Sequence, residues 1–349
     1  MSVADFRSDT VTRPTPAMRT AMAAAEVGDD VLDGDPSVRR LEETAARWLG
    51  KEGALYVPSG TMANQIALGA WTRPGDALVA ERGAHVLNYE GGAAGYLHGL
   101  QSITLAGDRG ALDPADVRAT FRAPNIHCPK VALVCVEQTH MSSGGSVVPL
   151  DNLREVASVA RAAGVPVHMD GARLGNAVIA SGVAADAFAQ CADSVAICLS
   201  KGLGAPVGSL IAGDAPFIER ARLVRKRLGG WMRQAGIIAA GGIFALERNL
   251  ARLADDHRLA RELATSVGKI KGLACDAARV QTNLVLVDVT DTRFDAAQIA
   301  ARLGEHQIRV MPLGPRTLRF VTHMDVGADD VTRLERALRA ILEGVPARA

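Results

Sequence analysis

The stretch that decides the fold runs VAICLSKGLG from Val195 to Gly204. Its apolar half is too short for a helix and too apolar for an exposed edge, so it predicts a buried strand of a parallel sheet. Lys201 follows at the carboxyl end of this strand, where parallel sheets place their active sites. Shielded from water, the amine of such a lysine loses its charge more readily and can attack a carbonyl. An ordinary surface lysine is the alternative, because most lysines are exposed.

The composition indicates a large α/β enzyme without nucleic-acid or membrane partners. The 349 residues are 48% hydrophobic, which is enough for two domains with sizeable cores. A net charge of +1 leaves no basic face for nucleic acid, and no apolar run approaches the length of a membrane span. Five cysteines without a CxxC pair fit free thiols in a reducing compartment. With no signal peptide at the N-terminus, we expect a cytoplasmic protein.

A second informative stretch, VPVHMDGAR at 165–173, predicts another strand that ends in polar residues. Asp170 could pair with the ring nitrogen of a bound pyridine, and Arg173 could bond the phenolic oxygen of the same ring. The alternatives are a helix N-cap for Asp170 and a surface salt bridge for Arg173. Asp170 precedes Lys201 by 31 residues, a separation that fits two neighbouring strand ends reaching one cofactor.

A third stretch, PSGTMAN at 58–64, follows a short predicted strand and opens a helix. The free N–H groups at a helix N-terminus bind anions, and Gly60 and Thr61 would lie there. An ordinary capped helix is the alternative. A helix terminus for phosphate, an acid for a ring nitrogen and a lysine for a carbonyl together predict a site for pyridoxal phosphate (PLP).

The order of predicted elements indicates how the chain is divided. Strands and helices alternate up to about residue 256, which predicts a large three-layer α/β/α domain over 16–256. An N-terminal arm over 1–15 precedes it, and a smaller α+β domain over 257–349 follows. The glycines do not fit a dinucleotide or nucleotide-triphosphate loop, and the eight histidines lack HxxxH or HxH spacing, so we expect no metal site.

The motifs resemble those of the low-specificity L-threonine aldolases, in the aspartate aminotransferase-like superfamily of PLP enzymes. The resemblance covers nearly the whole chain and rests on RSDTVTRP at 7–14, GDDV…DP at 28–36, PSGTMAN at 58–64, HMDGAR at 168–173, SKGLGAPVGS at 200–209, MRQ at 232–234 and LRFVTH at 318–323. It implies PLP-dependent fold type I. It also implies retro-aldol cleavage of L-threonine, L-allo-threonine and related β-hydroxy-α-amino acids to glycine and an aldehyde.

The resemblance also assigns roles to the cofactor-binding residues. It implies that Lys201 forms the Schiff base, that Asp170 contacts the pyridine nitrogen and that His85 stacks on the ring. The remaining cofactor contacts that it implies are Arg173 on the phenolic oxygen, Gly60 and Thr61 on the phosphate, and Arg233 on the phosphate from across a subunit interface.

The substrate contacts come from the same resemblance. Ser8 and Arg319 match groups that hold the substrate carboxylate, and Lys226 is a further candidate. His127 matches a histidine near the substrate hydroxyl, so His85 and His127 are both candidates for the catalytic base. Leu32 stands where family members commonly have tyrosine, which suggests a preference for larger or more apolar substrates such as phenylserine.

Other functions remain open at this point. β-Elimination and transamination are alternative PLP reactions on the same scaffold, and a binding protein without activity is a more distant alternative. The superfamily builds its sites across subunits, so the resemblance implies a homotetramer, a dimer of dimers.

Overall fold

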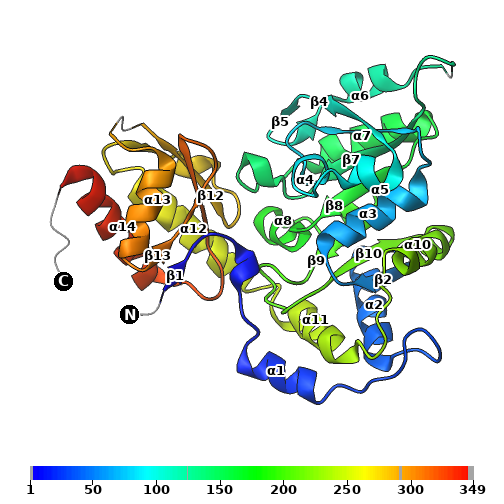
Figure 1. The fold of residues 1–349 in the computed structure, drawn as a ribbon, viewed down its shortest axis with the longest axis horizontal. Helices are drawn as coiled ribbons and strands as arrows, with labels where there is room; N and C mark the ends of the chain where they lie inside the picture. The colour runs from blue at the N-terminus through cyan, green and yellow to red at the C-terminus, as the bar shows by residue number, and fades with distance from the viewer. Residues whose placement is uncertain (1–2, 124, 291–292, 345–349) are drawn as a thin grey trace.

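The computed structural model describes residues 3–123, 125–290 and 293–344. The chain forms two parts, a larger one built on a central sheet and a smaller one that contains the C-terminal helix (Figure 1). The outer ends of the predicted arm and of the predicted small domain, residues 1–2 and 345–349, lie outside the described ranges. No helix in the described residues is long and apolar enough to cross a membrane.

The central sheet has seven strands in the order β2-β10-β9-β8-β7-β3-β4. Only β10 runs against its neighbours, and the five strands from β9 to β4 are parallel. The carboxyl ends of β3, β7, β8 and β9 therefore meet at one edge. The strands span β2 Gly53–Val57, β3 Ala77–Glu81, β4 Gln101–Leu105, β7 Val131–Glu137, β8 Val167–Gly171, β9 Ser194–Cys198 and β10 Ser209–Gly213.

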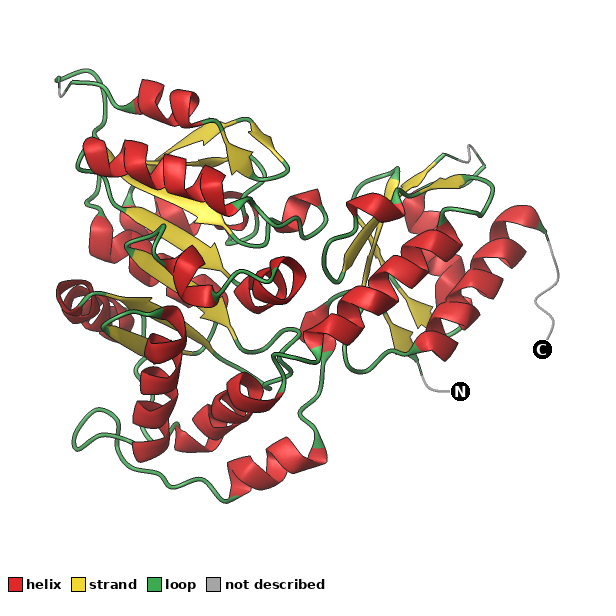
Figure 2. Cartoon of the chain, turned by 180° about the vertical axis from the view of Figure 1, so that it is seen from behind, coloured by secondary structure: helices red, strands yellow, loops and turns green. Residues whose placement is uncertain are grey.

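Helices cover both faces of this sheet, which gives the predicted three layers (Figure 2). One face packs against α3 Gly60–Trp71, α4 His85–Asn88, α5 Ala93–His98 and α10 Ala215–Arg227. The other face packs against α2 Pro36–Leu49, α7 Leu150–Ala162, α8 Leu174–Ser181, α9 Ala185–Ala189 and α11 Gly236–Arg248. The outer elements are α1 Pro16–Ala23, α6 Pro114–Thr120 and the hairpin β5 Gly107–Asp108 and β6 Ala111–Leu112.

Strand alternation decides which side chains reach the face that α3 covers. In β8, Val167 and Met169 belong to the apolar core on the α2 side. Because successive side chains of a strand point to opposite faces, His168 and Asp170 point toward α3 instead. Both are buried, so this face carries polar groups that need partners in the protein.

The small part has its own sheet and core. Its sheet has the order β11-β12-β15-β14. Its elements are α12 Leu253–Val267, β11 Leu273–Ala274, β12 Leu284–Val289, α13 Ala296–Glu305, β13 Ile308–Arg309, β14 Met311–Pro312, β15 Thr317–Val321 and α14 Ala328–Glu343. The arm joins this part: β1 Ala4–Asp5 pairs with β13, and Phe6 is fully buried in the same core. Figure 1 shows the arm passing from there to α1 under the large part.

Side chains fix the ends of two helices of the large part. α11 ends at Arg248, and the side chain of its C-cap residue Asn249 donates to the Leu203 carbonyl at 2.7 Å. The N-cap of α2 is Asp35, whose carboxylate accepts from two backbone N–H groups of the first turn. Pro36 then occupies the first helical position, where its missing N–H costs nothing.

Candidate active site

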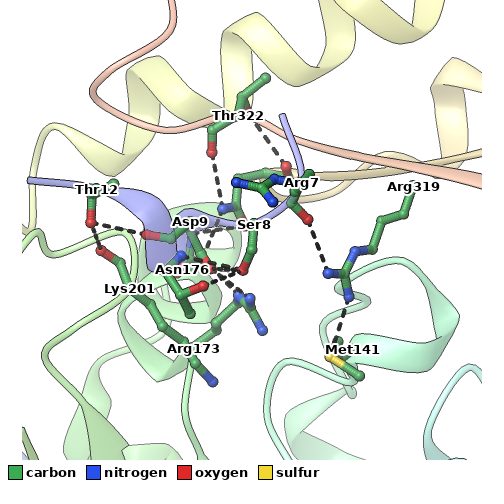
Figure 3. A network of polar contacts seen from close by, with 12 residues as sticks. Arg7, Ser8, Asp9, Thr12, Met141, Arg173, Asn176, Lys201, Arg319 and Thr322 are labelled. Atoms are coloured by element: carbon green, nitrogen blue, oxygen red, sulfur yellow. Dashed lines mark hydrogen bonds and ion pairs between the residues drawn. The ribbon is translucent and has the colours of Figure 1, made fainter. Parts of the chain in front are cut away.

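Lys201 lies in the turn that follows β9, at the carboxyl edge of the sheet. Its side chain is partly buried and lines a small pocket together with Arg173 and Cys198. The hydroxyl of Thr12 donates to the Lys201 carbonyl at 3.1 Å (Figure 3). The N-terminal arm thus supports the turn that carries the lysine.

Arg173 is held in place by an acid of the arm. Its Nε donates to Asp9 Oδ2 at 2.8 Å and its Nη2 to Asp9 Oδ1 at 2.7 Å, and the Asn283 amide donates to Oδ2 at 3.1 Å (Figure 3). Burial alone would raise the pKa of Asp9, but the charge and hydrogen bonds of Arg173 hold it well below its ordinary value. Asp9 stays charged and fixes the guanidinium in the pocket beside Lys201.

The N-terminus of α3 lies against the strand that precedes Lys201. The Ser59 hydroxyl caps the helix by accepting from Met62 N at 3.2 Å. The N–H groups of Gly60 and Thr61 have no acceptor among the described residues. A Cβ on Gly60 would lie 2.5 Å from Cys198 Sγ, so only glycine lets the helix approach β9 this closely. Two free donors and the positive end of the helix dipole therefore stand next to the lysine turn.

Asp170 and His85 meet at the same edge of the sheet. One atom from each, together with one from Glu90, forms a group within 4.8 Å. His85 Nδ1 lies 2.8 Å from Glu90 Oε1, and its backbone N–H donates to Glu137 Oε2 at 2.7 Å. Burial lowers the pKa of His85, but the hydrogen bond to Glu90 and the charge of Asp170 outweigh burial and raise it. The imidazole is thus oriented by Glu90 through Nδ1.

Arg319 on β15 is a buried cation with no acid partner among the described residues. It is 7% exposed. Its Nη2 donates to the Arg7 carbonyl at 3.0 Å and contacts Met311 Sδ at 3.0 Å, while its Nε has no hydrogen-bond partner in the described chain. Burial and the nearby charge of Arg173 lower its pKa. Since a buried charge is costly unless it is paired, this guanidinium is suited to an anionic ligand.

A cavity of about 840 Å³ opens at Arg319, between the two parts of the chain. Tyr89 and Met141 line it from the large part. Leu284, Leu286 and Leu313 line it from the small part. A ligand whose carboxylate bonds Arg319 would therefore have room for an apolar substituent.

The structure brings Ser8 close to this group but leaves other predicted residues away from it. Ser8 caps the short helix that begins with Asp9. His127 is exposed and precedes β7, so it lies at the amino edge of the sheet, opposite the edge of Lys201. Lys226 is exposed near the end of α10, and Leu32 is 74% exposed.

Arg233 is also separate from the lysine within one chain. Its Nη1 forms a salt bridge with Asp29 at 3.0 Å, and its side chain is 55% exposed. If His127 or Arg233 contacts the residues around Lys201, that contact would form between two copies of the chain.

The sequence predicted no role for three residues of the site: Asp9, Glu90 and Asn64, whose Nδ2 donates to Asp170 Oδ2 at 2.8 Å. Asp9 lies in the motif RSDTVTRP and Asn64 in the motif PSGTMAN. Their places in these motifs could have indicated a role in the site. Glu90 offered none, because an acid in a polar segment is usually solvated, whereas here it is 6% exposed.

Comparison with known proteins identifies the family. The beta-eliminating lyase family matches residues 5–292. The chain belongs to the beta-eliminating lyase family. Among curated relatives, it is 42% identical over 336 residues to low-specificity L-threonine aldolase 1 of Arabidopsis thaliana, covering 95% of this chain and 94% of the relative. It is 40% identical over 346 residues to the low specificity L-threonine aldolase of Escherichia coli K12, covering 97% and 99%.

Solved structures of low sequence identity share the fold of this family member. The threonine aldolase of Leishmania major superposes with a TM-score of 0.80 at 19% identity, covering 97% of this chain and 99% of that one. Serine palmitoyltransferase of Sphingomonas wittichii superposes with a TM-score of 0.75 at 18% identity, covering 99% and 89%. The predicted resemblance and the predicted fold, PLP-dependent fold type I, are both confirmed.

Proposed function

We propose that this chain is a PLP-dependent aldolase that cleaves L-threonine, L-allo-threonine and related β-hydroxy-α-amino acids to glycine and an aldehyde. The chain belongs to a family of lyases, and its relatives named L-threonine aldolase align over nearly their whole length. The observation that carries the proposal is the convergence of Lys201, Asp170, Arg173 and the α3 N-terminus at one sheet edge. The cofactor is PLP.

The residues at this edge fit PLP chemically. The unpaired N–H groups of Gly60 and Thr61 suit the phosphate. The buried Asp170 suits the protonated ring nitrogen, and the partly buried Lys201 suits the aldehyde. When bound, PLP supplies an electron sink for the bond that breaks.

The chain's own residues then orient the amino acid. We propose that Arg319 binds the substrate carboxylate, because its buried guanidinium has no acid partner among the described residues. Ser8, at the turn beside Asp9, is a second candidate contact. Gripping the carboxylate sets which bond at Cα faces the ring system, so these contacts select the bond that breaks.

A histidine moves the proton of the β-hydroxyl in this proposal. His85 has its Nδ1 bound to Glu90, so Nε2 is the nitrogen that would take the proton. His127 is the second candidate and acts from a neighbouring copy. Removing one general base slows such a reaction by typically about 10²- to 10⁴-fold. Parallel rates of His85→Asn and His127→Asn therefore identify the base.

We propose a homotetramer, a dimer of dimers, with sites that neighbouring copies complete. Arg233, His127 and Leu32 are exposed in the single chain and belong to the site of a neighbour in this proposal. Mixing inactive Lys201→Ala with inactive Arg233→Ala tests it, since hybrids regain one intact site if Arg233 acts across an interface. Sedimentation measurements give the number of copies.

We also propose a cytoplasmic location, which the state of the cysteines supports. All five cysteines are free thiols, two at intermediate depth and three buried. Free thiols persist where the environment is reducing.

One product assay tests the proposed reaction. The protein with PLP is given L-threonine, L-allo-threonine or L-phenylserine, and glycine and aldehyde are measured together. We expect both products in equal amounts from each substrate. Ammonia with an oxo acid would instead indicate β-elimination, and an amino-group acceptor requirement would indicate transamination.

A further inference from the structure

Asn64 lies between the two carboxylates at the centre of the site. It comes from the first turn of α3 and is 2% exposed. Its Nδ2 donates to Asp170 Oδ2 at 2.8 Å and to Glu90 Oε1 at 2.7 Å. Glu90 Oε1 in turn contacts His85 Nδ1 at 2.8 Å. One amide thus connects the acid predicted for the ring nitrogen with the acid that orients the ring-stacking histidine.

The direction of the Asn64 amide follows from its partners. The NH₂ group donates to the carboxylate oxygens of both Asp170 and Glu90 and therefore faces them. The oxygen Oδ1 must then face His168 Nε2, which lies 3.1 Å away. Because Oδ1 accepts and cannot donate, the proton of this contact belongs to His168 Nε2.

The other nitrogen of His168 is an acceptor. His168 Nδ1 lies 3.0 Å from Ser194 Oγ. The Trp71 indole N–H donates to the same Oγ at 2.9 Å, which leaves the serine hydroxyl hydrogen free to donate to Nδ1. Burial lowers the pKa of His168 to about 4, despite the opposing charge of Asp170. The imidazole is therefore neutral, with its hydrogen on Nε2.

We propose that Asn64 is a positioning residue, locked by its contact with His168 Nε2, that holds Asp170 and Glu90 in the arrangement the cofactor ring requires. The inference rests on the proposed function in one respect, namely that Asp170 contacts PLP. Two buried carboxylates on one amide repel each other less than two unsatisfied ones, because Nδ2 places a donor hydrogen on each. Without this amide, Asp170 loses its side-chain donor and Glu90 loses one of its two amide donors.

Gln65 provides a matched control on the same helix. It is also 2% exposed, and its Nε2 donates to Glu90 Oε2 at 2.7 Å. It has no hydrogen bond to Asp170 or His168. Asn64→Leu and Gln65→Leu therefore each remove one buried amide donor from Glu90, but only Asn64→Leu changes the surroundings of Asp170.

The test measures PLP affinity of the apoprotein by titration. A hydrogen bond to a charged group is worth about 10- to 100-fold in an equilibrium constant. We expect Asn64→Leu to weaken PLP binding by that factor, and Gln65→Leu to weaken it by less than about 3-fold. Equal losses in the two variants would overturn the inference while leaving the proposed function intact. A wild-type chain that binds no PLP would overturn both.

A second measurement does not depend on the variants folding or on PLP. Nitrogen-15 NMR of the wild-type apoprotein reports which ring nitrogen of His168 carries hydrogen, with His168→Gln used to assign the signal. We expect the neutral form with hydrogen on Nε2 at neutral pH. Hydrogen on Nδ1 with none on Nε2 would contradict the derived orientation of Asn64 and overturn the inference.

Discussion

Asp9 accepts two hydrogen bonds from Arg173, at 2.8 and 2.7 Å, across 164 residues of sequence. The pair ties the N-terminal arm to the segment that follows β8, and both side chains are buried. Arg173 is therefore oriented before any ligand arrives. Its predicted contact with the phenolic oxygen of the cofactor would be made by a guanidinium that Asp9 already holds.

Replacing Asp9 by asparagine should destabilise the fold strongly. The change leaves Arg173, 5% exposed, without a counter-charge, and breaking a buried pair in this way typically costs about 3–5 kcal/mol. Urea unfolding measures the loss. Asp151→Asn is the control, because Asp151 and Arg154 are 86% and 60% exposed and such a pair is worth about 0–1 kcal/mol. Equal losses in the two variants would contradict the assigned role of Asp9.

The same pair should make stability depend on acid. The pKa of Asp9 is lower in the folded chain than in the unfolded one. Its contribution is therefore fully present above about pH 4, the ordinary carboxyl range, and is lost as the pH falls further toward the folded pKa. Asp9→Asn should unfold with less acid dependence than the wild type below that pH, and an unchanged acid profile would speak against the pair.

Glu90→Gln should lower the pKa of His85. Burial alone lowers this pKa, and the hydrogen bond to Glu90 is the main influence that raises it. Because the folded pKa lies above the unfolded value of about 6.5, the stability from this pair is present below that pH and lost as pH rises through the folded pKa. NMR titration of the His85 ring gives the midpoint directly. A midpoint that does not fall in Glu90→Gln would remove Glu90 as the orienting partner.

Arg319→Leu should weaken substrate binding without lowering the stability of the free enzyme. Loss of a paired carboxylate contact should raise KM for L-threonine by about 10- to 100-fold. The free enzyme should not lose stability, because the variant removes a buried charge that has no acid partner in the described chain. Arg319→Lys keeps the positive charge but loses the two parallel N–H donors of the guanidinium. Its KM should therefore lie between those of the wild type and Arg319→Leu. A destabilised Arg319→Leu with unchanged KM would indicate a structural arginine.

Leu32→Tyr should alter substrate preference without altering the fold. Leu32 is 74% exposed, and substitutions at such positions usually change stability by less than about 0.5 kcal/mol. If Leu32 enters a neighbour's site, the added hydroxyl should favour L-threonine over L-phenylserine in kcat/KM. An identical ratio in the two proteins would mean that Leu32 does not reach a substrate.

Local sequence patterns predicted the sheet and the lysine turn well. The apolar run of β9 and the polar residues at the end of β8 indicate strands without knowledge of the rest of the chain. Gly60 could be predicted from the strand–turn–helix pattern, but the reason for glycine is a contact with Cys198 on another element. Such close approaches depend on packing and leave no local pattern.

The groups that orient the site could not be predicted in the same way. Asp9 and Arg173 are 164 residues apart, and Glu90 meets Asn64 only because α3 packs against the short helices after β3. A carboxylate has the same sequence signature whether it is solvated or buried against an arginine. Contacts between two copies, predicted for Arg233 and proposed for His127, likewise depend on surfaces that one sequence does not describe.

The most direct test of the account is chemical trapping of PLP on the protein. The wild-type chain is loaded with PLP, treated with borohydride to convert a Schiff base into a stable amine, and digested for mass spectrometry. The account predicts the pyridoxyl group on Lys201 and its absence from Lys201→Ala. Labelling of another lysine in place of Lys201, or no label on the wild-type chain, would contradict it.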